Sequence, residues 1–142
     1  PDMPPELPDH AEAGTQNVCG ICGLAAGLRF VQQQTPQRLL AHEVRQRKLL
    51  TSLLTDVPGV RLFTGEPQSG TLSLCAAQMD CEMLAARLAV KGVCVRAGLH
   101  CAPLAHESAG TLETGTVRFS LSAFNTEQEI FRTADLLKEI LA

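Results

Sequence analysis

The most constraining feature of this sequence is a run over about residues 36–56 in which apolar side chains recur at helical spacing. The polar segment 45–48 is predicted to lie largely off the resulting stripe. Thr35 and Pro36 precede the run as an N-cap and a first-turn proline. A helix of this kind has to bury its stripe, so we expect a packed domain around it. The stripe consists of Leu40, Val44, Leu49, Leu50, Leu53, Leu54 and Val57.

Short apolar runs and turn signals alternate after this helix, and a glycine-containing helical pattern over 18–34 precedes it. The predicted strands cover 60–64, 71–77, 93–95 and 116–121, and the predicted helices cover 81–91 and the segment after Asn125-Thr126. A long loop is expected over 97–115. This order is typical of a two-layer α/β (α+β) fold, a small mixed or antiparallel sheet with helices packed on one face. Residues 1–17 are expected to form an extended arm, and residues 18–142 one domain.

The composition excludes several classes of protein. The chain has 142 residues, a net charge of −3 and 19% charged residues, with five Phe and neither Trp nor Tyr, so a nucleic-acid partner is not expected. No apolar stretch approaches the ~20 residues of a membrane span, so no membrane partner is expected either. Six cysteines are too few for a disulfide scaffold, which favours a reducing, cytoplasmic location. The chain lacks an initiator Met, and we expect it to be part of a longer protein.

The stretch from Arg96 to His106 contains the residues best suited to chemistry. It follows a predicted strand directly and places the Cys101 thiol next to the His100 imidazole, with Arg96 at its start. Neighbouring cationic groups favour the thiolate, which is the nucleophilic form of cysteine. A loop cysteine whose neighbouring histidine points away, and a zinc ligand, are the alternatives.

Arg118 is the second candidate. Strand alternation places it on the opposite face from Val117 and Phe119, which are expected to face the core. Its guanidinium group can bind a carboxylate through two parallel hydrogen bonds. A surface arginine paired with a nearby glutamate is the alternative.

Two further motifs lie near the start of the first predicted helix. Cys19 and Cys22 form a CxxC, which can indicate redox or metal chemistry, but no strand precedes it and no second CxxC completes a metal site. Core packing is the simpler interpretation, and no metal is expected. Gly14 and Thr15 precede the helix and could present backbone N–H groups and a hydroxyl to a phosphate, or form only a capped turn.

Three segments, taken together and in this order, resemble the C-terminal part of class V aminotransferase-fold cysteine desulfurases, which depend on pyridoxal phosphate. Selenocysteine lyases share the pattern. The resemblance extends from about Leu7 to Leu141. The segments are Glu-Ala-Gly-Thr-Gln-Asn at 12–17, Arg-Ala-Gly-Leu-His-Cys-Ala at 96–102, and 116–126, which begins Thr-Val-Arg-Phe-Ser and ends Phe-Asn-Thr.

The resemblance implies a role for each candidate in the second and third segments. Cys101 would take sulfur from cysteine bound to the cofactor and become a persulfide, while alanine leaves. Arg118 would hold the substrate α-carboxylate, with Arg96 and His100 beside the thiol.

The resemblance also implies a homodimer in which Gly14 and Thr15 reach the cofactor phosphate of the partner subunit. The substrate would be L-cysteine or L-selenocysteine, and a sulfur-acceptor protein is a possible partner. The exposed arm and first helix would form an apolar patch, so we expect the chain alone to associate.

The lysines limit what the chain can do alone. A Schiff-base enzyme needs a desolvated lysine, and this chain has only Lys48, Lys91 and Lys138, which lie on predicted amphipathic helices or at a helix end. None corresponds to the family's cofactor lysine, which belongs to the large domain upstream. We therefore expect the C-terminal small domain of a desulfurase-like enzyme, inactive alone.

Two other functions remain open. One is a non-enzymatic thiol, redox or sulfur-carrier module that uses Cys101 or the Cys19/Cys22 pair, since such a module needs no lysine. The other is a class V aminotransferase or lyase that does not use the thiol.

Overall fold

The structure is a computed structural model that describes residues 4–12 and 14–142. The chain divides into two compact units, Pro1–Pro36 and Gln37–Ala142. The elements are η1 (Asp9–Ala11), α1 (Val18–Gln34), α2 (Pro36–Leu54), β1 (Val60–Phe63), β2 (Thr71–Ala76), α3 (Cys81–Val90), β3 (Arg96–Gly98), α4 (Pro103–Ala109), β4 (Thr116–Ser120) and α5 (Glu127–Leu141). In the described part of the chain, no helix is long and apolar enough to cross a membrane.

The first unit contains the arm and α1. The Asn17 side chain caps α1 by accepting a hydrogen bond from the Gly20 N–H at 2.9 Å. No described residue of α1 is buried. The arm was expected to be extended, but Asp9–Ala11 forms a turn of 3₁₀ helix. The domain boundary at residue 17 stays a prediction.

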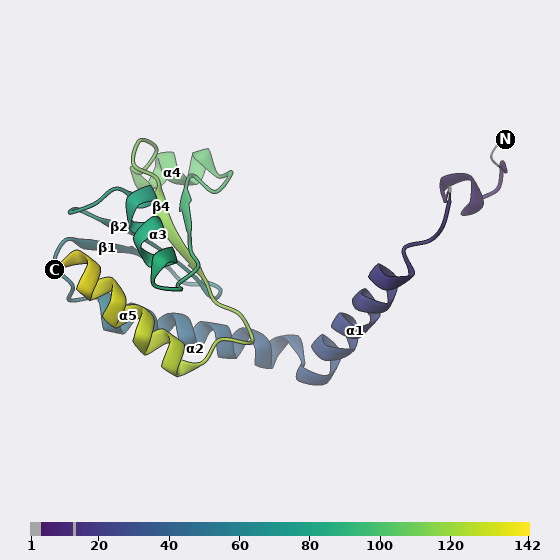
Figure 1. The fold of residues 1–142 in the computed structure, drawn as a ribbon, viewed down its shortest axis with the longest axis horizontal. Helices are drawn as coiled ribbons and strands as arrows, with labels where there is room; N and C mark the ends of the chain where they lie inside the picture. Colours follow the sequence, from purple (N-terminus) through teal and green to yellow (C-terminus); the bar gives the residue numbers. More distant parts are fainter. Residues whose placement is uncertain (1–3, 13) are drawn as a thin grey trace. The chain divides into compact units, whose positions relative to one another are not determined.

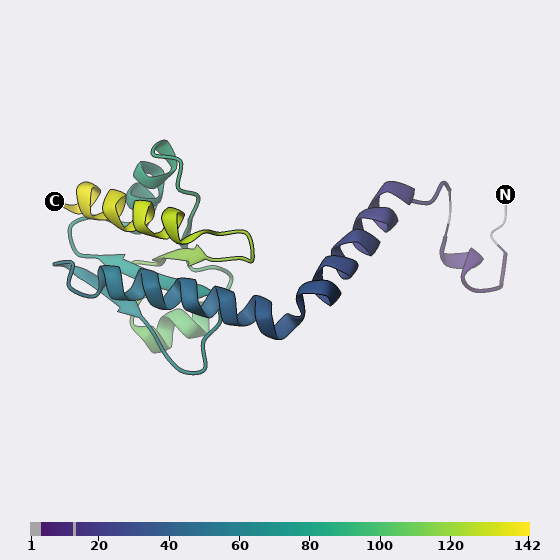
Figure 2. The same cartoon turned by 90° about the horizontal axis from the view of Figure 1, so that it is seen from below.

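The second unit is built on a four-stranded sheet in the order β1-β2-β4-β3, in which all neighbouring strands are antiparallel. Figures 1 and 2 show α2 and α5 side by side along this sheet. The register places Leu72 opposite Phe119 and Leu74 opposite Val117, and these four side chains face the helices. The predicted two-layer α/β fold is confirmed. The buried apolar side chains of the core are Leu50, Leu54, Leu72, Leu74, Leu84, Leu88, Val117, Phe119, Ile130, Ala134, Leu137 and Leu141.

Local signals define both ends of α3 and the start of α5. The Asp80 carboxylate caps α3 by accepting a hydrogen bond from the Met83 N–H at 2.8 Å, and Gly92 at φ +82° follows its end. Thr126 and Glu129 form a capping box at the start of α5, in which each side chain accepts a hydrogen bond from the other residue's backbone N–H.

The strand predicted over 93–95 lies three residues later in the structure, as β3 (Arg96–Gly98). Val93 and Val95 pack against the core as their apolar character predicts, but the backbone pairs with β4 only from Arg96 onward. Cys94 lies between the two valines and is exposed. The apolar residues of 93–95 therefore predict burial correctly but do not predict where strand pairing begins.

The expected loop over 97–115 contains the end of β3 and the whole of α4. Pro103 occupies the first turn of α4, and Gly110 ends it in a left-handed conformation, φ +67°. In Figure 2, α4 lies on the opposite side of the sheet from α3 and α5. Arg61, on the sheet face away from the core, donates a hydrogen bond to the Ala109 carbonyl at 3.1 Å. The loop therefore carries its own helix on the other face of the sheet.

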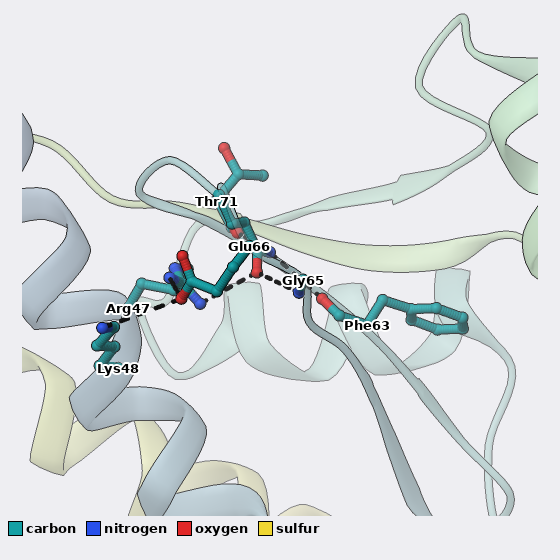
Figure 3. A network of polar contacts seen from close by, with 7 residues as sticks. Arg47, Lys48, Phe63, Gly65, Glu66 and Thr71 are labelled. Carbon is teal, nitrogen blue, oxygen red and sulfur yellow. Dashed lines mark hydrogen bonds and ion pairs between the residues drawn. The ribbon is translucent and has the colours of Figure 1, made fainter.

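Two residues of the polar segment 45–48 are buried, contrary to the prediction, whereas Arg45 and Lys48 are exposed as predicted. Gln46 and Arg47 are only 1% and 3% exposed. Arg47 Nη1 donates to Gln68 Oε1 at 3.0 Å, and its Nη2 lies 3.4 Å from a Glu66 carboxylate oxygen (Figure 3). The loop between β1 and β2 thus covers this face of α2. Pro36 opens α2 as predicted, but Thr35 has φ +62° and not the extended backbone of an N-cap.

Gln68 satisfies every hydrogen-bonding group of its own side chain within this loop. Its Oε1 also accepts from the Gly65 N–H at 3.0 Å. Its Nε2 donates to the carbonyls of Phe63, at 3.3 Å, and Thr71, at 2.8 Å. One amide side chain therefore ties the ends of two strands to a helix.

Candidate active site

Two arginines face each other on the outer side of the sheet. The register of β3 and β4 places Arg96 directly opposite Arg118, and Gly98 opposite Thr116. Val117 and Phe119 are buried in the core, so Arg118 points to the face away from the core helices α2, α3 and α5, as strand alternation predicts. Within residues 4–12 and 14–142 neither arginine forms an ion pair, and Arg118 Nε is buried without a hydrogen-bond partner. This arrangement favours an anionic ligand.

A tight turn that follows β3 contains Cys101. His100 and Cys101 both have left-handed backbone conformations, with φ of +53° and +59°. The Ala102 N–H donates to the Leu99 carbonyl at 2.9 Å and closes the turn. Such a conformation costs roughly 1–2 kcal/mol for each residue with a side chain, so surrounding contacts have to maintain it. The Cys101 thiol is exposed just before α4.

One of these contacts comes from His100 itself. Its Nε2 lies 3.1 Å from the Thr116 hydroxyl on β4, whereas its Nδ1 is buried without a hydrogen-bond partner. Burial, then the positive charges of Arg118, His106 and Arg96, hold the pKa of His100 below its ordinary value of 6.5. These effects favour the neutral form of the His100 imidazole.

The residues that hold His100 were not predicted from the sequence. Thr116 lies two positions before Arg118 on the same face of β4, which the period of a strand could have revealed. His106 is buried on α4, with its Nδ1 2.8 Å from the Thr111 hydroxyl. That contact depends on a helix which the sequence pattern did not predict.

The other candidates belong to the first unit. Gly14 and Thr15 are exposed, and Gly14 has φ +88°. Their role at a phosphate stays a prediction. Cys19 and Cys22 are free, exposed thiols on α1, so the core-packing interpretation of this CxxC is wrong for the structure described. The described residues contain no cluster of three or more His, Cys, Asp or Glu that could bind a metal.

Comparisons with known proteins identify the class to which this fold and site belong. The family profile described as aminotransferase class-V matches residues 4–132. The chain belongs to the class V aminotransferase family.

Within that family the relatives are cysteine desulfurases. A probable cysteine desulfurase of Methanothermobacter thermautotrophicus is 34% identical over 139 residues, which are 95% of this chain and 34% of that protein. One from Mycolicibacterium paratuberculosis is 39% identical over 124 residues, 87% of this chain and 18% of that protein. The apo cysteine desulfurase of Thermococcus onnurineus superposes with a TM-score of 0.82 at 28% identity, over 94% of this chain and 34% of that one. This chain spans about a third or less of the length of these relatives.

Proposed function

We propose that the chain is the small domain of a pyridoxal phosphate-dependent cysteine desulfurase whose Cys101 accepts sulfur from L-cysteine. The names of the relatives support the enzyme class. The observation that carries the residue assignment is the Arg96–Arg118 pair, whose charges act on His100, the residue directly before the exposed Cys101. A carboxylate-bearing thiol substrate matches both halves of this site.

The residues of this chain can bind the substrate carboxylate, but none of them is suited to form the Schiff base with the cofactor. The buried, unpartnered Nε of Arg118 matches a substrate carboxylate. None of the chain's three lysines is desolvated: Lys48 lies 3.9 Å from Glu66, Lys91 lies 3.0 Å from Glu139, and Lys138 is exposed. We therefore propose that the chain alone does not turn over. Gly14 and Thr15 are the residues here that would hold the cofactor phosphate.

The chain's own residues account for sulfur transfer to Cys101. Pyridoxal phosphate, when bound, supplies an electron sink that weakens the Cβ–Sγ bond of the substrate. Arg118 binds the α-carboxylate through its planar guanidinium, and Arg96 adds positive charge on the same face. His100 takes the proton of the Cys101 thiol, and the thiolate attacks the substrate sulfur. A sulfur–sulfur bond forms as the carbon–sulfur bond breaks. The substrate carbon gains a proton, so a thiol and L-cysteine become a persulfide and L-alanine.

The proposal extends to the partners and location of the enzyme. L-selenocysteine presents the same carboxylate to the same residues, and a more polarisable atom to the attacking thiolate. The exposed persulfide would be passed to a sulfur-acceptor protein in the cytoplasm. A homodimer would cover the exposed apolar side chains of α1, among them Ile21, Leu24 and Leu28.

The test compares this chain with the longer desulfurase-like protein that contains it, each supplied with pyridoxal phosphate and L-cysteine. We expect alanine and sulfide from the longer protein only. Cys101→Ser should abolish both alanine and the protein persulfide, whereas Cys94→Ser, at another exposed thiol, should leave them unchanged. Full alanine production by Cys101→Ser would instead support an aminotransferase or lyase that does not use the thiol. Turnover by the 142-residue chain alone would refute its proposed inactivity.

A thiol or redox module is a second candidate because Cys19 and Cys22 are both exposed and stand three positions apart on α1. Peptide-resolved alkylation at neutral pH distinguishes the two functions. Labelling first at Cys101 supports the desulfurase loop, and labelling first at Cys19 or Cys22 supports the redox module.

A further inference from the structure

The buried histidine of α4 has no role in the function proposed above. His106 is 6% exposed, and its Nδ1 lies 2.8 Å from the Thr111 hydroxyl. The left-handed Gly110 turns the chain back after α4, so that the Thr111 N–H donates to the His106 carbonyl at 2.8 Å. The Thr111 hydroxyl also donates to the His106 carbonyl at 3.4 Å. Three hydrogen bonds therefore join the same pair of residues, and the imidazole of His106 is held in one orientation.

This fixed ring lies against the ring of His100. The two ring centroids are 5.7 Å apart and the ring planes are tilted by 48°. On its other side His100 contacts the Thr116 hydroxyl at 3.1 Å. His100 is thus held between a strand and α4, and each histidine has a threonine hydroxyl as partner.

We propose that His106 is a positioning residue: its ring, fixed by Thr111, holds His100 in the orientation in which Nε2 contacts the Thr116 hydroxyl, and that contact selects one tautomer. The catalytic meaning of this contact rests on the proposed function, in which His100 accepts the thiol proton. The contact itself can be tested without turnover.

The charged groups that face His100 are Arg118 from β4, Arg96 from β3 and His106 from α4. Burial of the ring and these three groups all lower the pKa of His100, and its contact with Thr116 acts in the opposite direction. A smaller neutral side chain at position 106 removes the electrostatic effect of His106 on His100 and reduces the burial of the His100 ring. The pKa of His100 should therefore rise towards 6.5 in such a variant.

The experiment records long-range ¹H–¹⁵N spectra of the imidazoles of this chain as a function of pH. His100→Gln assigns the His100 signals among those of the four histidines. We expect wild-type His100 to show one tautomer and a depressed titration midpoint. His106→Asn, which can still bond Thr111 through its amide, should raise that midpoint and mix the tautomers. Thr111→Val, which keeps the ring but removes its hydroxyl partner, should mix the tautomers as well.

His42→Asn is the matched control, because His42 bonds the Asn125 carbonyl and is not among the groups that face His100. It should leave the His100 signals unchanged. The proposal is overturned if folded His106→Asn and Thr111→Val both retain the wild-type midpoint and tautomer. If His106→Asn does not fold, Thr111→Val alone decides. Failure of the desulfurase assignment would appear separately, as unchanged activity in Cys101→Ser.

Discussion

Arg96 and Arg118 occupy directly opposed positions on neighbouring antiparallel strands, so two positive charges share one face of the sheet. Opposed like charges destabilise a sheet by a few tenths of a kcal/mol, and among the described residues no carboxylate pairs with either arginine. The pair therefore destabilises the free chain, and a bound carboxylate would offset this repulsion.

The first prediction concerns this repulsion. Arg96→Gln should stabilise the chain by about 0.5 kcal/mol in urea denaturation at low salt. The gain should shrink in molar salt, which screens exposed charges. Arg87→Gln, at an exposed position in the last turn of α3, should show no gain. Lower stability of Arg96→Gln at low salt would contradict the prediction.

The second prediction concerns Gln68, whose side chain forms four hydrogen bonds. Gln68→Ala leaves the buried Arg47 and three backbone groups without this partner, so the free energy of unfolding should fall by about 2–3 kcal/mol. Glu66→Gln removes only the exposed end of the same network, shown in Figure 3, and should cost less than about 1 kcal/mol. Equal effects of the two substitutions would show that Gln68 does not hold the loop.

The third prediction is a pH dependence. The Thr126 N–H, and then the Asn125 side chain, hold the pKa of Glu129 below its ordinary value of 4.5. Because the folded-state pKa is the lower one, the stability from this carboxylate is present above pH 4.5 and is lost as the pH falls through the folded-state value. Glu129→Gln should therefore be less stable than wild type at pH 7, and the difference should narrow in acid. Thermal unfolding at a series of pH values measures it, and a constant difference would refute the role of the charge.

The fourth prediction concerns Cys75. Burial raises the pKa of its thiol, which also donates a hydrogen bond to the Gly115 carbonyl at 3.3 Å. Cys75 should therefore alkylate more slowly at pH 7 than the exposed thiols of Cys94 and Cys101. Peptide-resolved mass spectrometry gives the rates, with the urea-unfolded chain as the control in which the difference disappears. Equal rates in the folded chain would contradict the burial of Cys75.

The fifth prediction concerns α1, whose apolar side chains are exposed along the helix. Ile21, Leu24 and Leu28 are each more than half exposed. We expect the chain to associate in light scattering, and Leu24→Glu with Leu28→Glu to reduce this association. Leu104→Glu, at an exposed leucine of α4, is the control and should leave it unchanged. A wild-type monomer across a wide concentration range would count against the prediction.

The sequence predicted those parts of the fold that local signals determine. The caps at Asp80 and Thr126 and the apolar periodicity of α5 act within one turn of chain, so the predicted starts of α3 and α5 agree with the structure. The burial of Gln46 and Arg47 could not be predicted in this way, because it depends on a loop about twenty residues later that folds over α2. The position of β3 likewise depends on where β4 offers free backbone groups.

In the candidate site, too, individual residues could be found from the sequence, whereas the contacts between them could not. His100, Cys101 and Arg118 were candidates by residue type, and the family resemblance supplied the roles proposed for them. The pairing of Arg96 with Arg118 required the strand register. The contact of His106 with His100 required α4, a helix of seven residues that hydrophobic periodicity cannot detect.

The left-handed backbone at Cys101 also limits which side chains this position can accept. Glycine, asparagine and aspartate adopt φ near +59° at the least cost, and serine is tolerated better than any β-branched residue. Valine, often chosen as an inert replacement for cysteine, would distort the turn and displace His100. A variant that lacks the thiol but keeps its surroundings should therefore carry serine or asparagine at this position. Loss of function in a valine variant would say nothing about sulfur.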